Sequence, residues 1–494
     1  MRRRSLLVTF LLLAAGCDVD FLVRRPSAEV PVADAAHPEP DAAIPIPDAA
    51  LPDAAGAGLD ASVPSTDAAL PDAAGSGLDA APEPTDAALE PADAGLSGDA
   101  GSQPPPDAAA TPDAAPAGPD AGLLDWRQFG PDQWPLVQQQ LQAAAALGTT
   151  GTPTATQLSD DFTSEPGCRW TGSILAPNGR IYGIPTEAGR VLEIDPTASP
   201  ATARRVGPDL GGSAGVWKWS GGVLAANGRI YGIPYHLDSV LIIDTTTDPV
   251  GISTAATGVS GHWGGGLRGY DGKLYAIPID QGRVLSIDPA TDPPTFEAFG
   301  DLSGIGTDAG GELLGLASLS PLDGLIYAAP YAAKTVVRID PVARTVAPVG
   351  SALPASGYKY WGIKLAMDGR LYASPDGASG VLVVDPTTAP ATVTTFASAA
   401  FGTDGLVLAP SGSLFAIPWS AGSVFELKPS GATTITIPVT PAAPGAGDWT
   451  GGALAPNGRI YSAPCRATRV LEVDPKAAGS LGLDVLLGGY LNHY

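Results

Sequence analysis

The feature that most constrains the fold of this chain is an internal repeat of about 45 residues. The segment from Trp170 to Pro196, WTGSILAPNGRIYGIPTEAGRVLEIDP, returns near the other end of the chain as WTGGALAPNGRIYSAPCRATRVLEVDP, from Trp449 to Pro475. Further copies begin at Trp219, Trp263, Leu319, Trp361 and Val407. Together these copies predict one repetitive domain rather than several unrelated ones.

The spacing inside each copy is constant. A glycine in a turn is followed six residues later by a proline in every copy. The glycines are Gly179, Gly228, Gly272, Gly324, Gly369, Gly412 and Gly458, and the prolines are Pro185, Pro234, Pro278, Pro330, Pro375, Pro418 and Pro464. Ten residues after each proline stands an aspartate, except in the sixth copy, where Lys428 takes its place. Chance does not produce this regularity.

Each copy is typical of three β-strands with a looser fourth. The pair Asn178-Gly179 predicts a two-residue hairpin of type I′, and the proline ends the second strand because it cannot donate to a ladder. A loop from Thr186 to Gly189 leads to a third strand that ends in an aspartate, which we expect to cap the following turn. Candidate fourth strands are 203–206, 295–299 and 433–439.

A meander of this length in seven copies predicts an all-β fold, a seven-bladed β-propeller over residues 151–494. The third strand is apolar on both faces, as expected if neighbouring blades cover both sides. An aromatic residue recurs in the second strand and is expected to pack between blades. These residues are Tyr182, Tyr231, Tyr275, Tyr327, Tyr372, Phe415 and Tyr461.

The pattern G-x-I/L-Y-x-x-P followed by V-x-x-I-D-P resembles the broad propeller group that includes the NHL, YVTN and virginiamycin B lyase-like proteins. The resemblance covers about residues 168–488 and implies the fold. Members of this group include lyases, lactonases, scaffolds and surface proteins, so the resemblance does not imply one activity.

Residues 1–16 are typical of a lipoprotein signal peptide, with a basic start at Arg2 to Arg4 and an apolar run from Leu6 to Ala15. The run Leu-Ala-Ala-Gly-Cys that ends at Cys17 resembles the bacterial lipobox, although Ala14 stands where leucine is usual. The resemblance implies that Cys17 is lipidated and anchors the chain to a membrane. The alternative is an ordinary secretory signal with an incidental cysteine.

Residues 17–122 are rich in Pro, Ala and Asp, and they predict a disordered stalk because they hold too little apolar surface to form a core. The formal net charge of −24 lies mainly there: residues 151–494 hold 21 basic and 29 acidic residues, or −8, which leaves −16 for residues 1–150. This acidity argues against nucleic-acid binding. Residues 123–150 predict a short helix that packs on the propeller or acts as a spacer.

Five tryptophans open first strands, at the expected mouth of a central channel: Trp170, Trp219, Trp263, Trp361 and Trp449. Polar or charged residues lie near them in the sequence, namely Arg169, Lys218, His262, Lys359 and Asp448. The set is consistent with an aromatic, partly basic rim that binds a glycan, a peptide or an anionic small molecule. The alternative is that the indoles are packing wedges between blades.

Titratable groups give weak support for an enzyme. His236 and His262 are expected on the same face of neighbouring blades, where Asp238 or Asp280 could complete a site, but no metal-binding spacing motif is present. The repeated aspartates lack the clustering of calcium loops. We therefore predict no catalytic residue, no metal and no cofactor.

A disulfide between Cys168 and Cys465 is predicted. If Cys17 is lipidated, these are the two thiols left in an oxidising compartment. Cys168 precedes the first blade and Cys465 lies in the last, so the two residues meet if the ring closes. We expected residues 481–487 to complete the last blade, with the disulfide securing the seam. The alternative is two unpaired cysteines.

These features predict a monomeric, lipid-anchored binding or interaction module of the bacterial cell envelope, facing the periplasm or the cell surface, with an unknown ligand. An envelope enzyme of the propeller lyase or lactonase type is the alternative, and a purely structural surface protein is a third.

Overall fold

The computed structural model describes residues 126–128, 130–279, 282–308, 310–354, 357–396, 398, 402–441 and 449–487. The predicted signal peptide, Cys17 and the predicted stalk lie outside these residues. Within them, no helix is both long and apolar enough to cross a membrane.

The repeats form four-stranded antiparallel sheets, which confirms the predicted β-propeller fold. The first repeat supplies β2 (Trp170–Leu175), β3 (Ile181–Pro185), β4 (Val191–Asp195) and β5 (Thr202–Val206), which pair in that order. The predicted fourth strand is therefore present.

Four further sheets repeat this arrangement. They are β6 (Trp219–Leu224), β7 (Arg229–Pro234), β8 (Ser239–Asp244) and β9 (Gly251–Ala256); β10 (Trp263–Arg268), β11 (Leu274–Pro278), β12 (Val284–Asp288) and β13 (Thr295–Phe299); β14 (Leu314–Leu319), β15 (Ile326–Pro330), β16 (Val336–Asp340) and β17 (Thr345–Val349); and β18 (Tyr360–Leu365), β19 (Leu371–Pro375), β20 (Val381–Asp385) and β21 (Thr392–Phe396).

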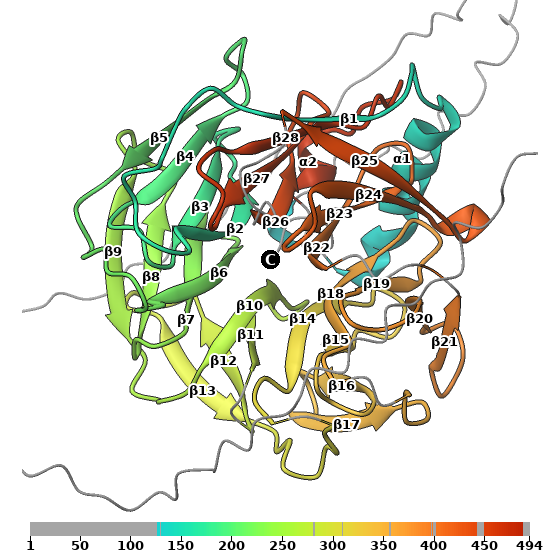
Figure 1. The fold of residues 1–494 in the computed structure, drawn as a ribbon. Helices are drawn as coiled ribbons and strands as arrows, with labels where there is room; N and C mark the ends of the chain where they lie inside the picture. Colours follow the sequence, from blue (N-terminus) through green and yellow to red (C-terminus); the bar gives the residue numbers. More distant parts are fainter. Residues whose placement is uncertain are drawn as a thin grey trace, which may run out of the picture. The chain divides into compact units, whose positions relative to one another are not determined.

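An eight-stranded sheet closes the ring. It joins β22 (Thr403–Leu408), β23 (Leu414–Pro418), β24 (Ser423–Lys428) and β25 (Thr433–Thr440) to β26 (Trp449–Leu454), β27 (Ile460–Pro464), β28 (Leu471–Asp474) and β1 (Thr154–Gln157). The innermost strands β2, β6, β10, β14, β18, β22 and β26 surround the centre, and β26 contacts β2 (Figure 1).

The last blade takes its outer strand from the beginning of the domain. β1 pairs antiparallel with β28, with Ala155 opposite Val473, and parallel with β25 of the preceding blade. The expectation that residues 481–487 complete this blade was wrong, because Leu483–Leu486 form the short helix α2. The ring is therefore closed by strand exchange between the two ends as well as by a disulfide.

The hairpin between the first two strands differs from the predicted type I′ turn. Leu175 pairs with Ile181, and Gly179 N donates to Ala176 O, so the loop has three residues, Pro177, Asn178 and Gly179. Only Gly179 has a positive φ, +78°. Proline fixes φ near −65°, which suits the second residue of a type I turn, and a left-handed glycine then closes a three-residue hairpin.

The repeated tyrosine links the hairpin to the core. Tyr182 is fully buried, and its hydroxyl accepts a hydrogen bond of 2.9 Å from the Asn178 side chain. In the sixth repeat Phe415 replaces the tyrosine, and Ser411 replaces the asparagine or aspartate that would bond its hydroxyl. The recurring aromatic residue of the second strand is buried, which agrees with the prediction that it packs between blades.

The repeated aspartate caps the turn after the third strand, as predicted. Asp195 accepts hydrogen bonds from the backbone N–H of Thr197 at 3.0 Å and from its hydroxyl at 2.6 Å. Asp244 and Asp385 do the same for Thr246 and Thr387.

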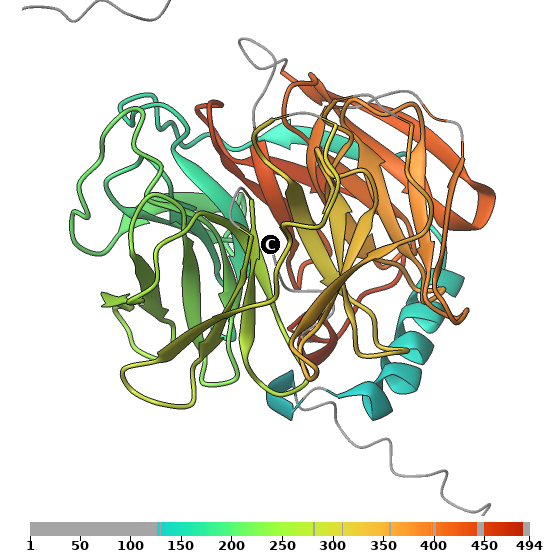
Figure 2. The same ribbon diagram turned by 90° about the horizontal axis from the view of Figure 1, so that it is seen from below.

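The segment before the propeller packs on the face where the hairpins lie (Figure 2). It comprises η1 (Trp126–Gln128), η2 (Pro131–Gln133) and α1 (Trp134–Ala146). One side of α1 is buried, and Gln138 Nε2 donates to Met367 O in a hairpin at 2.7 Å. Arg268, at the end of an innermost strand, donates to Trp126 O. Packing, the first of the two predicted alternatives for this helix, is what the structure shows.

Candidate functional site

Cys168 and Cys465 form the predicted disulfide, with Cα atoms 4.1 Å apart and a sequence separation of 297. The neighbouring Arg169 reinforces this seam. Its Nη1 donates to the backbone carbonyls of Cys465 at 3.1 Å and Arg466 at 3.0 Å, and its Nε donates to Phe162 O at 2.9 Å. The predicted rim cation Arg169 is therefore buried and bound to backbone.

Four of the five predicted rim tryptophans lie between blades. Each is at most 2% exposed, and each indole N–H donates to the carbonyl of the residue twenty positions later. The pairs are Trp170 with Arg190, Trp219 with Ser239, Trp263 with Arg283 and Trp449 with Arg469. These surroundings agree with the alternative that the indoles are packing residues. They leave no indole face of these four tryptophans open to a ligand.

The other predicted basic residues are also engaged in the structure. Lys218 Nζ donates to Ala188 O at 2.9 Å, and Lys359 Nζ forms an ion pair of 2.8 Å with Asp308. Both lysines are buried. Asp448 lies outside the described residues.

Trp361 is displaced by one position relative to the other four tryptophans. In the first blade Trp170 pairs with Pro185, whereas in the fifth Tyr360 pairs with Pro375. Trp361 is therefore equivalent to Thr171, the second residue of the innermost strand, and it is partly exposed. Because side chains alternate along a strand, the shift turns this indole toward the channel.

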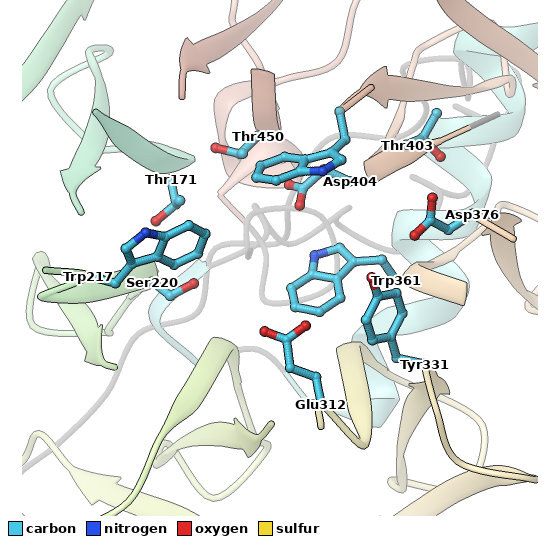
Figure 3. Close-up of a pocket in the computed structure, with 11 residues that line it drawn as sticks. Thr171, Trp217, Ser220, Glu312, Tyr331, Trp361, Asp376, Thr403, Asp404 and Thr450 are labelled. Atoms are coloured by element: carbon cyan, nitrogen blue, oxygen red, sulfur yellow. The ribbon is translucent and has the colours of Figure 1, made fainter. Parts of the chain in front are cut away.

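A cavity of about 140 Å³ lies at the end of the channel where the innermost strands begin (Figure 3). The second residues of four other innermost strands line it together with Trp361, and loop residues complete the wall. The full lining is Thr171, Trp217, Ser220, Glu312, Tyr331, Trp361, Asp376, Thr403, Asp404, Trp419 and Thr450. Among the described residues, the lining contains three carboxyl groups and four aromatic side chains, and no lysine or arginine.

The hydroxyl and carboxyl groups at the second strand position also join neighbouring blades. Thr171 Oγ1 accepts from Gly221 N at 3.0 Å, and Asp404 Oδ2 accepts from Gly451 N at 2.8 Å. Thr450 Oγ1 accepts from Gly172 N at 3.2 Å. This part of the wall is therefore held rigidly by the propeller itself.

One side of the cavity is aromatic. The rings of Tyr331 and Trp361 meet edge to face with centroids 4.9 Å apart, and Tyr358 stacks behind Tyr331 at 4.4 Å. Trp361 Nε1 is buried and has no hydrogen-bond partner among the described residues. In Figure 3 this nitrogen lies on the side of the ring that faces Asp404. An indole donor without a partner is unusual at a buried position, and a ligand could accept its hydrogen bond.

The electrostatics of the cavity are acidic. Burial raises the pKa of Asp376 above its ordinary value, and a hydrogen bond from the Tyr331 hydroxyl partly opposes that rise. Burial, followed by the charges of Asp376 and Glu312, raises the pKa of Tyr331, which is therefore a neutral donor at physiological pH. The Asp376 carboxylate is costly in this setting unless a positive group approaches it.

His236 and His262 lie side by side next to this cavity, on the same face as predicted. Their ring centroids are 5.2 Å apart, and Tyr235 stacks on His262 at 5.6 Å. The Tyr235 hydroxyl donates to Glu312 Oε1 at 3.2 Å, which connects the pair to the cavity wall. The described residues contain no group of three or more His, Cys, Asp or Glu arranged to hold a metal ion. Asp280 lies outside them.

Sequence reasoning missed most of the lining, yet a signal for it exists. The residue immediately after the constant proline varies among the repeats, and only tyrosine occurs twice: Thr186, Tyr235, Ile279, Tyr331, Asp376, Trp419 and Cys465. Three of these line the cavity and a fourth contacts Glu312. A variable position inside an otherwise constant repeat marks the place where the fold does not dictate the residue.

No protein-family model and no curated protein matches the chain. Among solved structures, a catalytically inactive variant of virginiamycin B lyase from Staphylococcus aureus with quinupristin is similar, at 14% identity and a TM-score of 0.52, over 65% of this chain and 99% of that one. A streptogramin B lyase structure is similar at 12% identity and a TM-score of 0.51, over 65% and 96%. These likenesses show that the fold is that of virginiamycin B lyase-like β-propellers, and at such identities they show the fold alone.

Proposed function

We propose that this protein is a lipid-anchored binding module of the bacterial envelope that holds a small ligand in the cavity at the channel mouth. The observation behind the proposal is that several positions at which the repeats differ line one and the same cavity. Trp361, Tyr331, Asp376 and Trp419 stand at variable positions of the repeat, and all four line the same cavity. A set of aromatic and polar groups on a rigid scaffold is the usual construction of a small-molecule site.

The attachment of the chain supports display of this cavity. Trp126 and α1 pack on the hairpin face, where the innermost strands end, whereas the cavity lies where those strands begin. A six-residue strand is about 20 Å long, so the two faces are well separated. The described part of the chain therefore begins on the face away from the cavity.

A ligand screen on the full-length protein tests the proposal. Metabolites, sugars and short peptides are screened by ligand-observed NMR against the wild type and against Trp361→Ala, which removes the central ring of the cavity. We expect at least one compound class to bind the wild type and to lose binding in the variant. Binding that is the same in both proteins, or no binding at all, contradicts this site.

The alternative function is an envelope enzyme, and the His236 and His262 pair beside Glu312 favours testing it. The similar lyase structure was solved with quinupristin. Incubating this protein with quinupristin and following the compound by liquid chromatography and mass spectrometry distinguishes the two functions. The binding proposal expects unchanged quinupristin. If the protein converts quinupristin and the His262→Gln variant does not, the enzyme function is supported in place of the binding function.

A further inference from the structure

The chemistry of the cavity wall narrows the class of ligand, on the premise that this cavity is the binding site. We propose that it binds an organic cation, a compound whose ammonium or quaternary ammonium head group enters between the carboxylates and the aromatic rings. This ligand differs from the glycan, peptide or anionic small molecule that the predicted, partly basic rim suggested.

The charge of the wall is the first argument. Glu312, Asp376 and Asp404 all line the cavity, and none of the described lining residues is a lysine or an arginine. The predicted basic residues that lie nearby in sequence are engaged elsewhere: Lys359 with Asp308, and Lys218 with a backbone carbonyl. Carboxylates gathered in a partly desolvated cavity repel one another, and a cationic ligand would relieve that repulsion.

The aromatic groups are the second argument. Trp217, Tyr331 and Trp361 surround the same space as the carboxylates (Figure 3). Trp419 also lines the cavity. The faces of such rings attract cations, most strongly for tryptophan, and aromatic cages are the usual means of binding quaternary ammonium groups. Arg466 is not among the lining residues, and its guanidinium lies 5.3 Å from the Trp419 ring centroid, so one ring of this set already has a cation beside it.

The size of the cavity is the third argument. A volume of about 140 Å³ corresponds to about five water molecules at roughly 30 Å³ each, which is enough for a trimethylammonium or alkylamine head group. The unpartnered Trp361 N–H adds one donor, which suits a hydroxyl or carbonyl oxygen carried by the same molecule. A choline-like compound combines these features.

Matched pairs of compounds test the charge requirement. Isothermal titration calorimetry of the full-length protein compares choline with its neutral isostere 3,3-dimethylbutan-1-ol. It also compares an alkylamine and a diamine, each with an alcohol of equal length. We expect at least one cation to bind at a single site about tenfold or more tightly than its isostere. Equal affinity within every pair, or no binding by any cation at millimolar concentration, overturns the proposal.

Two variants tie binding to the wall without breaking the ring. Glu312→Gln and Asp376→Asn keep the shape of the side chains, and neither residue forms the bond between blades that Asp404 forms with Gly451. Each is expected to weaken the cation about tenfold or more and to leave the isostere unchanged. Asp244→Asn, in a turn outside the cavity, is the matched control and should change neither. Loss of binding in the control, or unchanged binding in both cavity variants, contradicts the assignment.

The outcome also separates this inference from the proposed function. If a sugar or neutral peptide binds in a Trp361-dependent manner and no cation does, the inference of a cationic ligand is wrong and the proposed binding function stands. If no compound of any class binds in a Trp361-dependent manner, both fail.

Discussion

Trp361 and Thr171 occupy the same position in their strands, the residue directly after the one that pairs with the closing proline. This equivalence divides the tryptophans of the first strands into two groups with different roles. Trp170, Trp219, Trp263 and Trp449 lie one position earlier and are buried between blades, whereas Trp361 lines the cavity. The two groups should respond differently to substitution.

We expect Trp449→Ala to lower the free energy of unfolding by about 3–5 kcal/mol, because it leaves a cavity between blades and removes the bond to Arg469 O. Trp361→Ala should change it by about 1 kcal/mol or less, since this indole is partly exposed and its N–H is unpartnered. Denaturant unfolding of both variants measures the difference. Similar losses for the two would mean that Trp361 is also a packing residue.

The disulfide between Cys168 and Cys465 should stabilise the closed ring. Replacing both cysteines with alanine is expected to lower stability by about 2–5 kcal/mol, because the unfolded chain gains the freedom that the long cross-link removed. The fold itself should persist, since β1 and Arg169 still hold the seam. Thermal unfolding with and without reductant measures the effect, with the double variant as the control that reductant should not change. An unaltered melting temperature in reductant contradicts this role.

Asp376→Asn should raise stability at neutral pH while it weakens ligand binding. Burial holds the pKa of Asp376 in the folded protein above its unfolded value, so the unfolded state binds fewer protons in the interval between them. Wild-type stability therefore falls as pH rises through that interval, and the asparagine variant lacks this fall. Melting temperatures from pH 3 to 7 should converge at the acidic end. A variant that is less stable than the wild type at pH 7 would contradict an uncompensated carboxylate.

Cys17→Ser tests the proposed lipid anchor, which lies outside the described residues. If Cys17 is the acyl acceptor, the wild-type protein expressed in a bacterial host should partition into the detergent phase and the variant into the aqueous phase. Ala14→Leu, which brings the lipobox closer to its usual form, is a control that should stay in the detergent phase. Identical partitioning of the wild type and Cys17→Ser would exclude the anchor.

The propeller was predictable because the same strand and turn signals recur in every repeat. The proline that ends the second strand, the turn glycine and the terminal aspartate act through local backbone chemistry. The proline and the aspartate have the predicted effect, whereas the glycine closes a three-residue hairpin in place of the predicted two-residue one. The closure was not predictable in the same way. β1 is only four residues long and resembles no other part of the repeat, so nothing local identifies Thr154–Gln157 as the outer strand of the last blade.

The candidate site was harder to predict for a related reason. A one-residue shift in strand register reverses the direction of a side chain, so Trp361 could not be told from Trp170 before the pairing of Tyr360 with Pro375 was known. Glu312 comes from a loop that has no repeated pattern. The cations in the sequence were visible, but their burial against backbone carbonyls was not, and the predicted sign of the rim was therefore the reverse of the sign of the cavity.

The most direct test of the central claim is fluorine NMR of the protein labelled with 5-fluorotryptophan, which gives one resonance for each of its nine tryptophans. Trp361→Phe and Trp449→Phe assign a cavity resonance and a buried one. When the best cation of the panel is added, the account predicts saturable shifts at Trp361, Trp217 and Trp419, with Trp170, Trp219, Trp263 and Trp449 unchanged. Shifts confined to the buried set, or no shift at Trp361 while the compound binds, would contradict a ligand site at the channel mouth.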